Sequence, residues 1–335
     1  MNSVPRLSVV IPTYRRRASV ERALGALAQQ SMSPADYEVV VSIDGSQDGT
    51  RELLDSYRAP YALHSLWRPN GGRAAALNAG IGLAAGEVLV LLDDDMEPAP
   101  EFLAGHFRAH SVDGRRGVMG AAPIPIDLGS PPLVAAYIGP KFNAHMVKLA
   151  QPGHLLTLRD FYSGNFSIRR EVLLEVGLFD ESFKIYGNED LELAHRLRQA
   201  GVTLVYAAEA LAYQHYTKDF VALARDTIAK GQTAVLLASK HPETLPELQL
   251  SAYAQGSRRW RWLRAGLLAL SRYWAQTPQA IAGLISWLER RRLKSLPLIY
   301  RLALEYFYWM GAQTALSDNG RAGIGLSALP RRVET

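Results

Sequence analysis

The segment at residues 87–95, EVLVLLDDD, decides the fold of this 335-residue chain. It combines an apolar run of strand length, rich in valine and leucine, with three aspartates that follow directly. An apolar run without alternating polar residues is typical of a strand buried on both faces of a parallel sheet. Ligands of open parallel sheets bind beyond the carboxyl ends of the strands. The segment therefore predicts a buried strand that carries three carboxylates to the binding edge.

Two earlier runs have the same character, Leu7–Ile11 (LSVVI) and Glu38–Ile43 (EVVVSI). Stretches of helical spacing separate the runs, at residues 19–30, 48–57 and 73–85. Strands that alternate with helices predict an α/β fold, in which a mostly parallel sheet is covered by helices on both faces. The residues that follow the two runs are again polar or turn-forming: Pro12, Thr13 and Tyr14, then Asp44, Gly45 and Ser46.

The three aspartates favour a metal site. Adjacent carboxylates repel one another, so a fold keeps them only where positive charge offsets the repulsion. If the backbone stays extended, Asp93 and Asp95 point one way and Asp94 points the other. Oxygen ligands of this kind suit Mg²⁺ or Mn²⁺, which would also bridge the phosphates of a nucleotide. A solvated acidic turn, or an N-cap ahead of residues 98–110, is the alternative that the cluster alone leaves open.

Composition limits the class of protein. With 48% hydrophobic and 21% charged residues, the chain is typical of a globular protein with a sizeable core. The absence of cysteine excludes disulfides, thiolate metal sites and cysteine nucleophiles. We identify no secretory signal, and the apolar stretch 298–316 contains Arg301, Glu305 and Gln313, so we predict no transmembrane span and a cytoplasmic location.

The second half of the chain changes character. Glycine and proline are frequent between Pro123 and Pro152, which predicts an irregular segment. Residues 219–239 and 262–316 have helical patterns, and the helices are expected to break at four prolines. These are Pro242, Pro246, Pro278 and Pro297.

The C-terminal part is basic, because residues 256–335 hold 13 Lys and Arg against 4 Asp and Glu. Two interpretations stay open. The helices either pack on the preceding part of the chain or form a homodimer, with solvated arginines, or they make peripheral contact with an anionic membrane at its inner face. No nucleic-acid motif accompanies the charge, so nucleic acid is not an expected partner. The cations and indoles concerned are Arg258, Arg259, Trp260, Arg261, Trp262, Arg290, Arg291, Arg292 and Lys294.

Six motifs occur in one order along the chain: VVIPTYRR at 9–16, DGSQDGT at 44–50, NGGRAAALNAG at 70–80, LDDDM at 92–96, GNFSIRR at 164–170 and GNEDLELAHRL at 187–197. Together they resemble family 2 glycosyltransferases. The resemblance implies a GT-A fold, a nucleotide-sugar donor (most commonly a UDP-sugar), a divalent metal and inversion at the transferred sugar. It also implies a catalytic domain over residues 1–217, with a nucleotide-binding half at about 1–112 and an acceptor half at about 113–217, followed by a helical region at 218–335.

The family pattern assigns a nucleotide site to four residues. It places Pro12, Thr13 and Asp44 around the nucleobase. It places Arg73 near the base or the phosphates.

The remaining donor and acceptor residues follow in the same way. Asp93 and Asp95 match the Asp-x-Asp pair that contacts ribose and metal, with Asp94 beside them in the donor site. Gly164 and Asn165 resemble the stretch that lines the sugar and acceptor pocket, although a plain turn is equally compatible with them.

The segment Asn188-Glu189-Asp190 offers two candidates for the base that removes the acceptor proton. If Asn188 caps a helix, Asp190 shares a face with apolar residues three, four and seven positions on, and Glu189 shares one with charged residues. We therefore expect Asp190 to face inward as the base, as in the family's Glu-Asp motif. Glu189 is expected to face solvent at the sugar or acceptor pocket. Taken alone, these residue types are also what any helix N-terminus favours.

His215 lies in an aromatic string shortly after an apolar run at residues 202–208. Several family members supply a histidine to the metal from this region, and neutral imidazole suits Mn²⁺. A metal ligand and a packed histidine both remain open. Lys218, just beyond, either meets the diphosphate or is solvated.

Two other functions compete with an inverting transfer of sugar to a hydroxyl of a glycan, a lipid-linked acceptor or a small molecule, as in polysaccharide biosynthesis. A sugar-nucleotide nucleotidyltransferase would need a glycine-rich basic loop after the first strand, which is missing. A noncatalytic GT-A-like partner protein would have little reason to retain Asp93, Asp95 and Asp190 together. The sequence therefore favours the transferase.

Overall fold

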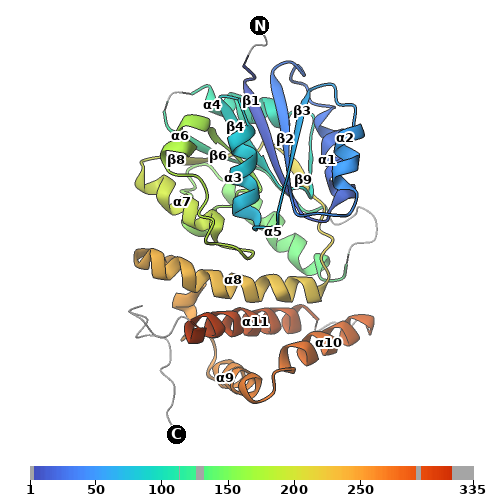
Figure 1. Cartoon of the computed structure of the whole chain (residues 1–335). Helices are drawn as coiled ribbons and strands as arrows, with labels where there is room; N and C mark the ends of the chain where they lie inside the picture. Colours follow the sequence, from blue (N-terminus) through green and yellow to red (C-terminus); the bar gives the residue numbers. More distant parts are fainter. Residues whose placement is uncertain (1–3, 113, 126–131, 292–295, 319–335) are drawn as a thin grey trace. The chain divides into compact units, whose positions relative to one another are not determined.

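The computed structural model describes residues 4–112, 114–125, 132–291 and 296–318 (Figure 1). The chain folds into two compact units. Unit 1 comprises the described residues of 1–130, 138–184 and 189–216. Unit 2 comprises those of 131–137, 185–188 and 217–335.

Unit 1 is built on a seven-stranded sheet in the order β3-β2-β1-β4-β7-β6-β8. Neighbouring strands are parallel except for β7, which runs antiparallel between β4 and β6. A small antiparallel pair, β5 and β9, completes the strands. Their bounds are β1 Leu7–Thr13, β2 Tyr37–Asp44, β3 Ala62–Arg68, β4 Val88–Leu92, β5 Met96–Pro98, β6 Arg116–Gly120, β7 Asn165–Arg169, β8 Thr203–Ala207 and β9 Ala212–Gln214.

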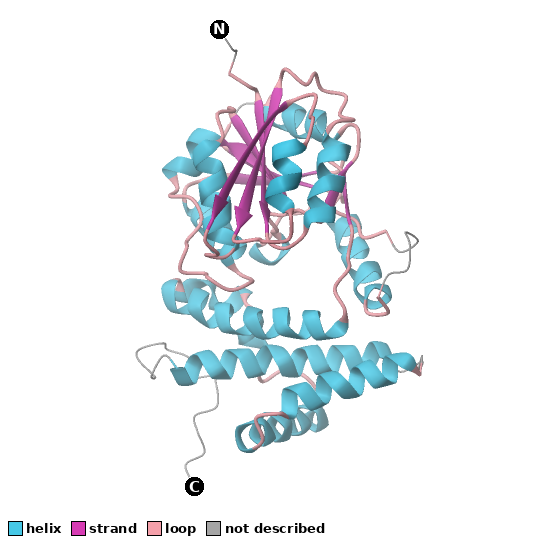
Figure 2. Ribbon diagram, turned by 45° about the vertical axis from the view of Figure 1, so that its right-hand side comes forward, coloured by secondary structure: helices cyan, strands magenta, loops and turns pink. Residues whose placement is uncertain are grey.

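Helices cover both faces of this sheet (Figure 2). Successive side chains of a strand point to opposite faces, and the buried strands use both. Val10 packs with α3 and α7 on one face, and Val9 packs with α1 and α4 on the other. The prediction of a mostly parallel sheet with helices on both faces is confirmed. The helices are α1 Arg17–Leu27, α2 Thr50–Ser56, α3 Arg73–Leu83, α4 Phe102–His110, α5 Ala135–Leu149, α6 Arg170–Glu175 and α7 Glu189–Gln199, with a 3₁₀ turn, η1, at Leu158–Asp160.

The expectation of an irregular segment from Pro123 to Pro152 is wrong for much of its length. The 15-residue helix α5 lies there, and Pro140 is inside it. A proline inside a helix removes one backbone hydrogen bond. Met146 and Leu149 of α5 are buried in the core of unit 1, so apolar burial offsets that loss.

Unit 2 is helical, as predicted. Its elements are α8 Phe220–Lys240, η2 Pro242–Glu247, η3 Gln249–Ala252, α9 Arg258–Tyr273, α10 Thr277–Arg290 and α11 Leu296–Asp318. Helices α8 and α11 lie side by side (Figure 1) and approach at glycines. A Cβ on Gly231 would lie 2.0 Å from the carbonyl oxygen of Tyr308, and one on Gly311 would lie 2.0 Å from that of Ile228. Among the described residues, no helix is both long and apolar enough to cross a bilayer.

Candidate active site

The three aspartates lie at the carboxyl edge of the sheet, but not in the predicted orientation. Strand β4 ends at Leu92 and the chain turns, with the amide of Met96 donating to the carbonyl of Asp93 (3.1 Å). The backbone is therefore not extended, and the alternation expected for Asp93 to Asp95 is wrong. Asp94 and Asp95 instead accept hydrogen bonds from the same Nη1 of Arg16, at 3.1 and 3.0 Å.

Asp94 is the buried member of this aspartate turn. Its second oxygen accepts a 2.7 Å hydrogen bond from the hydroxyl of Thr13, at the end of β1. Burial raises the pKa of Asp94 to about 7, although the Arg16 guanidinium acts in the opposite direction. Burial therefore disfavours the charged form of this carboxyl group.

Arg73, the first residue of α3, joins the aspartate turn to helix α7. Its Nε and Nη2 donate to Asp93 at 3.1 and 2.7 Å, and its Nη1 donates to the Ser163 hydroxyl (2.9 Å) and to Glu189 (3.3 Å). Asp93, Glu189 and Asp190 all act electrostatically on this guanidinium. The structure therefore gathers carboxylates from the turn after β4 and from α7 around one arginine.

Glu189 does not face solvent, contrary to the prediction. Its side chain is buried, as is that of Glu192 one turn on, whereas Asp190 is half-buried. Both glutamates are paired with arginines, Glu189 with Arg73 and Glu192 with Arg196 at 2.6 Å. Burial, followed by the neighbouring Asp190, raises the pKa of Glu189. The helical-wheel argument failed because these pairings allow charged residues to be buried.

Asp44, at the end of β2, contacts the loop that leads to Arg73. Its two carboxylate oxygens accept the amide protons of Gly71 and Gly72, each at 2.9 Å. Gly72 has φ 90°, which favours glycine, and it precedes the first residue of α3. Asp44 thus fixes the loop from which Arg73 projects. Pro12 is buried at the end of β1.

His215 lies beside the aspartate turn. Its amide donates to the carbonyl of Asp95 (2.8 Å), and its Nε2 lies 2.5 Å from Glu97. A carboxylate on one ring nitrogen fixes the imidazole and leaves Nδ1 for another ligand. Lys218 pairs with Asp226 at 2.5 Å within unit 2.

Comparison with known protein families assigns the chain. The family model described as glycosyl transferase family 2 matches residues 8–177, half of the chain. The chain belongs to glycosyl transferase family 2. A second family model, described as the N-terminal domain of galactosyltransferase, matches residues 144–219 of this glycosyltransferase.

Curated relatives carry the same assignment. Validoxylamine A glucosyltransferase of Streptomyces hygroscopicus subsp. limoneus is 31% identical over 73% of this chain and 59% of its own length. A Campylobacter jejuni enzyme, GalNAc(5)-diNAcBac-PP-undecaprenol beta-1,3-glucosyltransferase, is 29% identical over 56% of this chain and 58% of its own. This chain thus spans about three fifths of the length of each of these relatives.

Solved structures establish the fold as GT-A. A mannosyltransferase from Pyrobaculum calidifontis, in complex with GDP-Man and Mn²⁺, has a TM-score of 0.59 at 22% identity and covers 94% of this chain and 88% of its own. S. aureus TarS 1–349, in complex with UDP-GlcNAc, has a TM-score of 0.53 at 15% identity and covers 93% of this chain and 92% of its own.

Asn165 of the glycosyltransferase does not line a pocket, contrary to the prediction. Its side chain is fully buried, and its Nδ2 donates to the carbonyls of Ala121 and Ala210, each at 2.9 Å. Its Oδ1 lies 2.8 Å from Nε2 of His106. As the first residue of β7, Asn165 points to the sheet face that α4 covers, so it holds the core together there.

Two buried histidines next to Asn165 give the glycosyltransferase a pH-dependent stability. Burial lowers the pKa of His106 to about 3 and that of His110 to about 4. Both contact the hydroxyl of Ser167, at 2.8 Å. The unfolded chain takes up protons near pH 6.5 and the folded chain does not, so their contribution is full above that pH and is lost as pH falls towards 4.

We therefore expect the free energy of unfolding to fall by about 1.4 kcal/mol per pH unit for each histidine below pH 6.5. His110→Gln should remove one histidine's share of that slope, because glutamine can still donate to Ser167 and does not titrate. Urea unfolding from pH 7 to pH 5 measures the slope. An unchanged slope in His110→Gln would contradict the argument.

Gly164 lies directly against Asp93. The amide of Asp93 donates to the carbonyl of Gly164 (2.9 Å), and a Cβ on Gly164 would lie 2.4 Å from Oδ2 of Asp93. Real Cβ atoms do not approach an oxygen so closely, so a side chain here has to displace the carboxylate.

Gly164→Ala is expected to lower the transfer rate by about 10²-fold, the usual cost of misplacing a reacting group by an ångström. The fold should persist, because the clash is with a side chain that is 32% exposed. Steady-state kinetics and thermal unfolding measure the two effects. Gly82→Ala is the matched control, since nothing lies within 4 Å of its Cβ position, and it should leave the rate unchanged. A normal rate in Gly164→Ala would show that Asp93 can move freely.

Sequence reasoning missed three residues of the site: Arg16, Ser163 and Glu97. Arg16 ends the VVIPTYRR segment, and the need for a cation beside three aspartates was the available signal for it. Ser163 and Glu97 are single polar residues whose sequence neighbourhood carries no such signal.

Proposed function

We propose that this glycosyltransferase moves a sugar from a nucleoside diphosphate donor to a hydroxyl acceptor with inversion, and that residues 1–217 form its catalytic domain. The observation that carries the proposal is the Arg73 bridge. It ties Asp93, at the donor edge of the sheet, to Glu189, the neighbour of Asp190. Asp93, the carboxylate proposed for the donor side, and Asp190, the proposed base for the acceptor, then lie around one guanidinium.

We propose a divalent cation, Mn²⁺ or Mg²⁺, with Asp95 and His215 as its protein ligands. The donor set fits, because carboxylate oxygen with imidazole nitrogen suits Mn²⁺. The electrostatics fit as well, because burial and neighbouring aspartates raise the pKa of Asp94, an effect that an added cation would offset. When bound, the metal would neutralise charge on the diphosphate leaving group.

The base is proposed to be Asp190. It is half-buried at the start of α7, where solvent and an acceptor can reach it, whereas Glu189 is buried against Arg73. The start of a helix also stabilises a negative charge. Asp190 would accept the proton of the acceptor hydroxyl as that oxygen attacks the sugar carbon, in line with the departing diphosphate.

The donor is proposed to bind along the ends of β1, β2 and β4, near Thr13, Asp44 and Asp93. Two structural neighbours contain GDP-Man or UDP-GlcNAc, and their sequence identity to this chain is low. They therefore do not identify the nucleobase of the donor. We propose a UDP-sugar as the donor.

A donor panel tests this proposal. UDP-glucose, UDP-galactose, UDP-GlcNAc and GDP-mannose are compared by thermal unfolding and by release of nucleoside diphosphate, each with Mn²⁺ and with EDTA. We expect one UDP-sugar to stabilise the protein by about 2.7 kcal/mol at a hundredfold excess over its Kd, and only when Mn²⁺ is present. Asp95→Asn should abolish that dependence. Equal donor binding in EDTA would remove the metal from the proposal.

A further inference from the structure

Exposed apolar side chains gather in one part of unit 2. Eight large ones lie between residues 262 and 298, and they include three of the six tryptophans of the chain. Clustered exposed apolar surface marks an interaction site more often than scattered residues do. The eight are Trp262, Leu263, Leu270, Tyr273, Trp274, Leu284, Trp287 and Leu298.

Helix α9 has two apolar faces. Leu268 is buried inside unit 2, as is Arg264, whose guanidinium pairs with Glu305. On the other side, Trp262 and Tyr273 are 71% and 91% exposed, and they lie eleven residues apart, which brings them back to the same face after three turns. Leu270, 45% exposed, continues this stripe.

Arginines flank the exposed stripe of α9. Arg258, Arg261 and Arg272 are exposed and fall along one border of it by helical spacing. A helix with tryptophan, tyrosine and leucine on one face and arginines beside them is typical of helices that lie in the plane of a membrane interface.

Helix α10 repeats the pattern on a shorter scale. Ala282 and Ile285 are buried, whereas Leu284 and Trp287 are 55% and 45% exposed. The guanidinium of Arg291 lies 4.9 Å from the centre of the Trp287 ring. Two neighbouring helices thus expose indoles that have a cation beside them.

Charge identifies the partner. Residues 256–291 contain seven arginines and one acid, Glu289, which accepts a 2.7 Å hydrogen bond from the Tyr300 hydroxyl. A second copy of this surface would bring arginines against arginines, which is unfavourable. We propose that α9 and α10 bind the surface of an anionic phospholipid bilayer, with the indoles at headgroup depth and the arginines on the phosphates.

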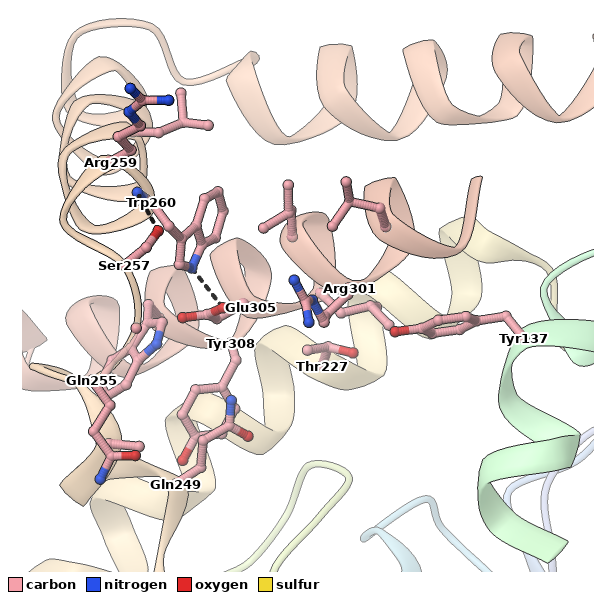
Figure 3. A pocket seen from close by; sticks show the side chains of 17 residues that line it. Tyr137, Thr227, Gln249, Gln255, Ser257, Arg259, Trp260, Arg301, Glu305 and Tyr308 are labelled. Atoms are coloured by element: carbon pink, nitrogen blue, oxygen red, sulfur yellow. Dashed lines mark hydrogen bonds between the residues drawn. The ribbon is translucent and has the colours of Figure 1, made fainter. Parts of the chain in front are cut away.

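A cavity in unit 2 adjoins this surface and suits a lipid headgroup (Figure 3). It has a volume of about 840 Å³, and Leu263 and Leu298, two of the exposed apolar residues, line it. Arg301 and Arg259 line it as well. Among the described residues, neither arginine forms an ion pair with a carboxylate.

The acid of this cavity is already engaged. Glu305 accepts hydrogen bonds from Nε1 of Trp260 (2.6 Å) and from Arg264 (2.7 Å). The dashed line in Figure 3 marks the bond from Trp260. Arg301 is therefore available for a lipid phosphate, with acyl chains along the adjoining leucines.

Vesicle binding by the full chain tests the proposal. Co-sedimentation and tryptophan fluorescence are measured with vesicles of phosphatidylcholine alone and of phosphatidylcholine with an equal part of phosphatidylglycerol. We expect binding to the mixed vesicles only, weakened by salt. Each arginine near the surface contributes roughly a fivefold change in affinity, so Arg258→Gln with Arg261→Gln should weaken binding by roughly 20-fold, and Arg301→Gln alone by roughly fivefold.

The apolar stripe has its own variant and control. Trp262→Ser with Tyr273→Ser should lower vesicle binding by about tenfold or more, because both side chains lose burial in the interface. Val147→Ser with Leu155→Ser, at residues 68% and 85% exposed in unit 1, should leave it unchanged, as should Arg51→Gln with Arg58→Gln. Thermal unfolding verifies that every variant is folded.

Three results would overturn the proposal: no sedimentation with the mixed vesicles, equal sedimentation with neutral vesicles, or loss of binding in the unit 1 controls. Light scattering adds a separate readout. If Trp262→Ser with Tyr273→Ser dissociates a dimer and leaves vesicle binding intact, the stripe is a contact between copies instead. Donor turnover is not a readout here, so these results are independent of the proposed catalytic roles.

Discussion

Asp190→Asn is expected to reduce the transfer rate by about 10²- to 10⁴-fold, the range over which a general base contributes to catalysis. Asparagine has the same shape, and it can still accept the 2.9 Å hydrogen bond that the amide of Leu191 donates to Asp190. The start of α7 should therefore stay intact. What is lost is a group that takes up the acceptor proton, so kcat falls and Mn²⁺-dependent binding of donor does not.

Initial rates with saturating donor, together with calorimetric donor titration, separate these two quantities. Asp36→Asn is the matched control, because Asp36 lies ahead of β2, at the end of the sheet away from the aspartate turn, in a surface pair with Arg6 at 3.6 Å. It should keep the full rate. If Asp190→Asn transfers sugar at a normal rate and Glu189→Gln does not, the base is Glu189 and the assignment here is wrong.

The central strands could be predicted because both of their faces are buried. Strands β1, β2 and β4 each contain a mostly apolar run, and every residue of each strand is buried. The edge strand β3 was missed, since most of its residues are exposed or half-buried and its sequence, ALHSLWR, has no such run. Strand β6, RGVMG, contains two glycines, and its sequence likewise does not predict a strand. Its place in the sheet comes from pairing with β7 and β8.

The sequence could propose the residues of the candidate site but could not predict their contacts. Motif order brought Asp93, Asp95 and His215 to one edge, where the structure also has them. Glu189 was misplaced because its partner, Arg73, lies 116 residues away, and no local pattern reports such a pairing. Asn165 was misplaced for the same kind of reason, since its hydrogen-bond partners come from the residue after β6, from α4 and from the loop before β9. Local spacing predicts which face a side chain is on only when no distant charge pairs with it.

Arg73→Gln should destabilise the protein by about 3–5 kcal/mol, the usual cost of removing one partner of a buried ion pair. The guanidinium holds Asp93 at 2.7 Å and Glu189 at 3.3 Å, and the Glu189 side chain is only 5% exposed. Without Arg73, that carboxylate remains buried beside Asp190 and loses this ion pair. Arg115→Gln is the control, because Arg115 pairs with Glu175 at the surface, and such pairs contribute at most about 1 kcal/mol.

The pH dependence of the stability lost in Arg73→Gln tests whether the buried charge of Glu189 causes that loss. Its pKa is already raised in the folded protein by burial and by Asp190, and losing Arg73 raises it further. A raised folded pKa means that stability is fully present below the unfolded value near 4.5 and is lost as pH rises through the folded value. The deficit of Arg73→Gln should therefore be largest at pH 8 and shrink towards pH 5. In urea unfolding without metal, Glu189→Gln added to Arg73→Gln should recover much of the loss at pH 8, because a neutral amide replaces the buried charge. A deficit that is the same at both pH values, and that the second substitution leaves untouched, would mean that Arg73 stabilises the fold through packing and not through its charge.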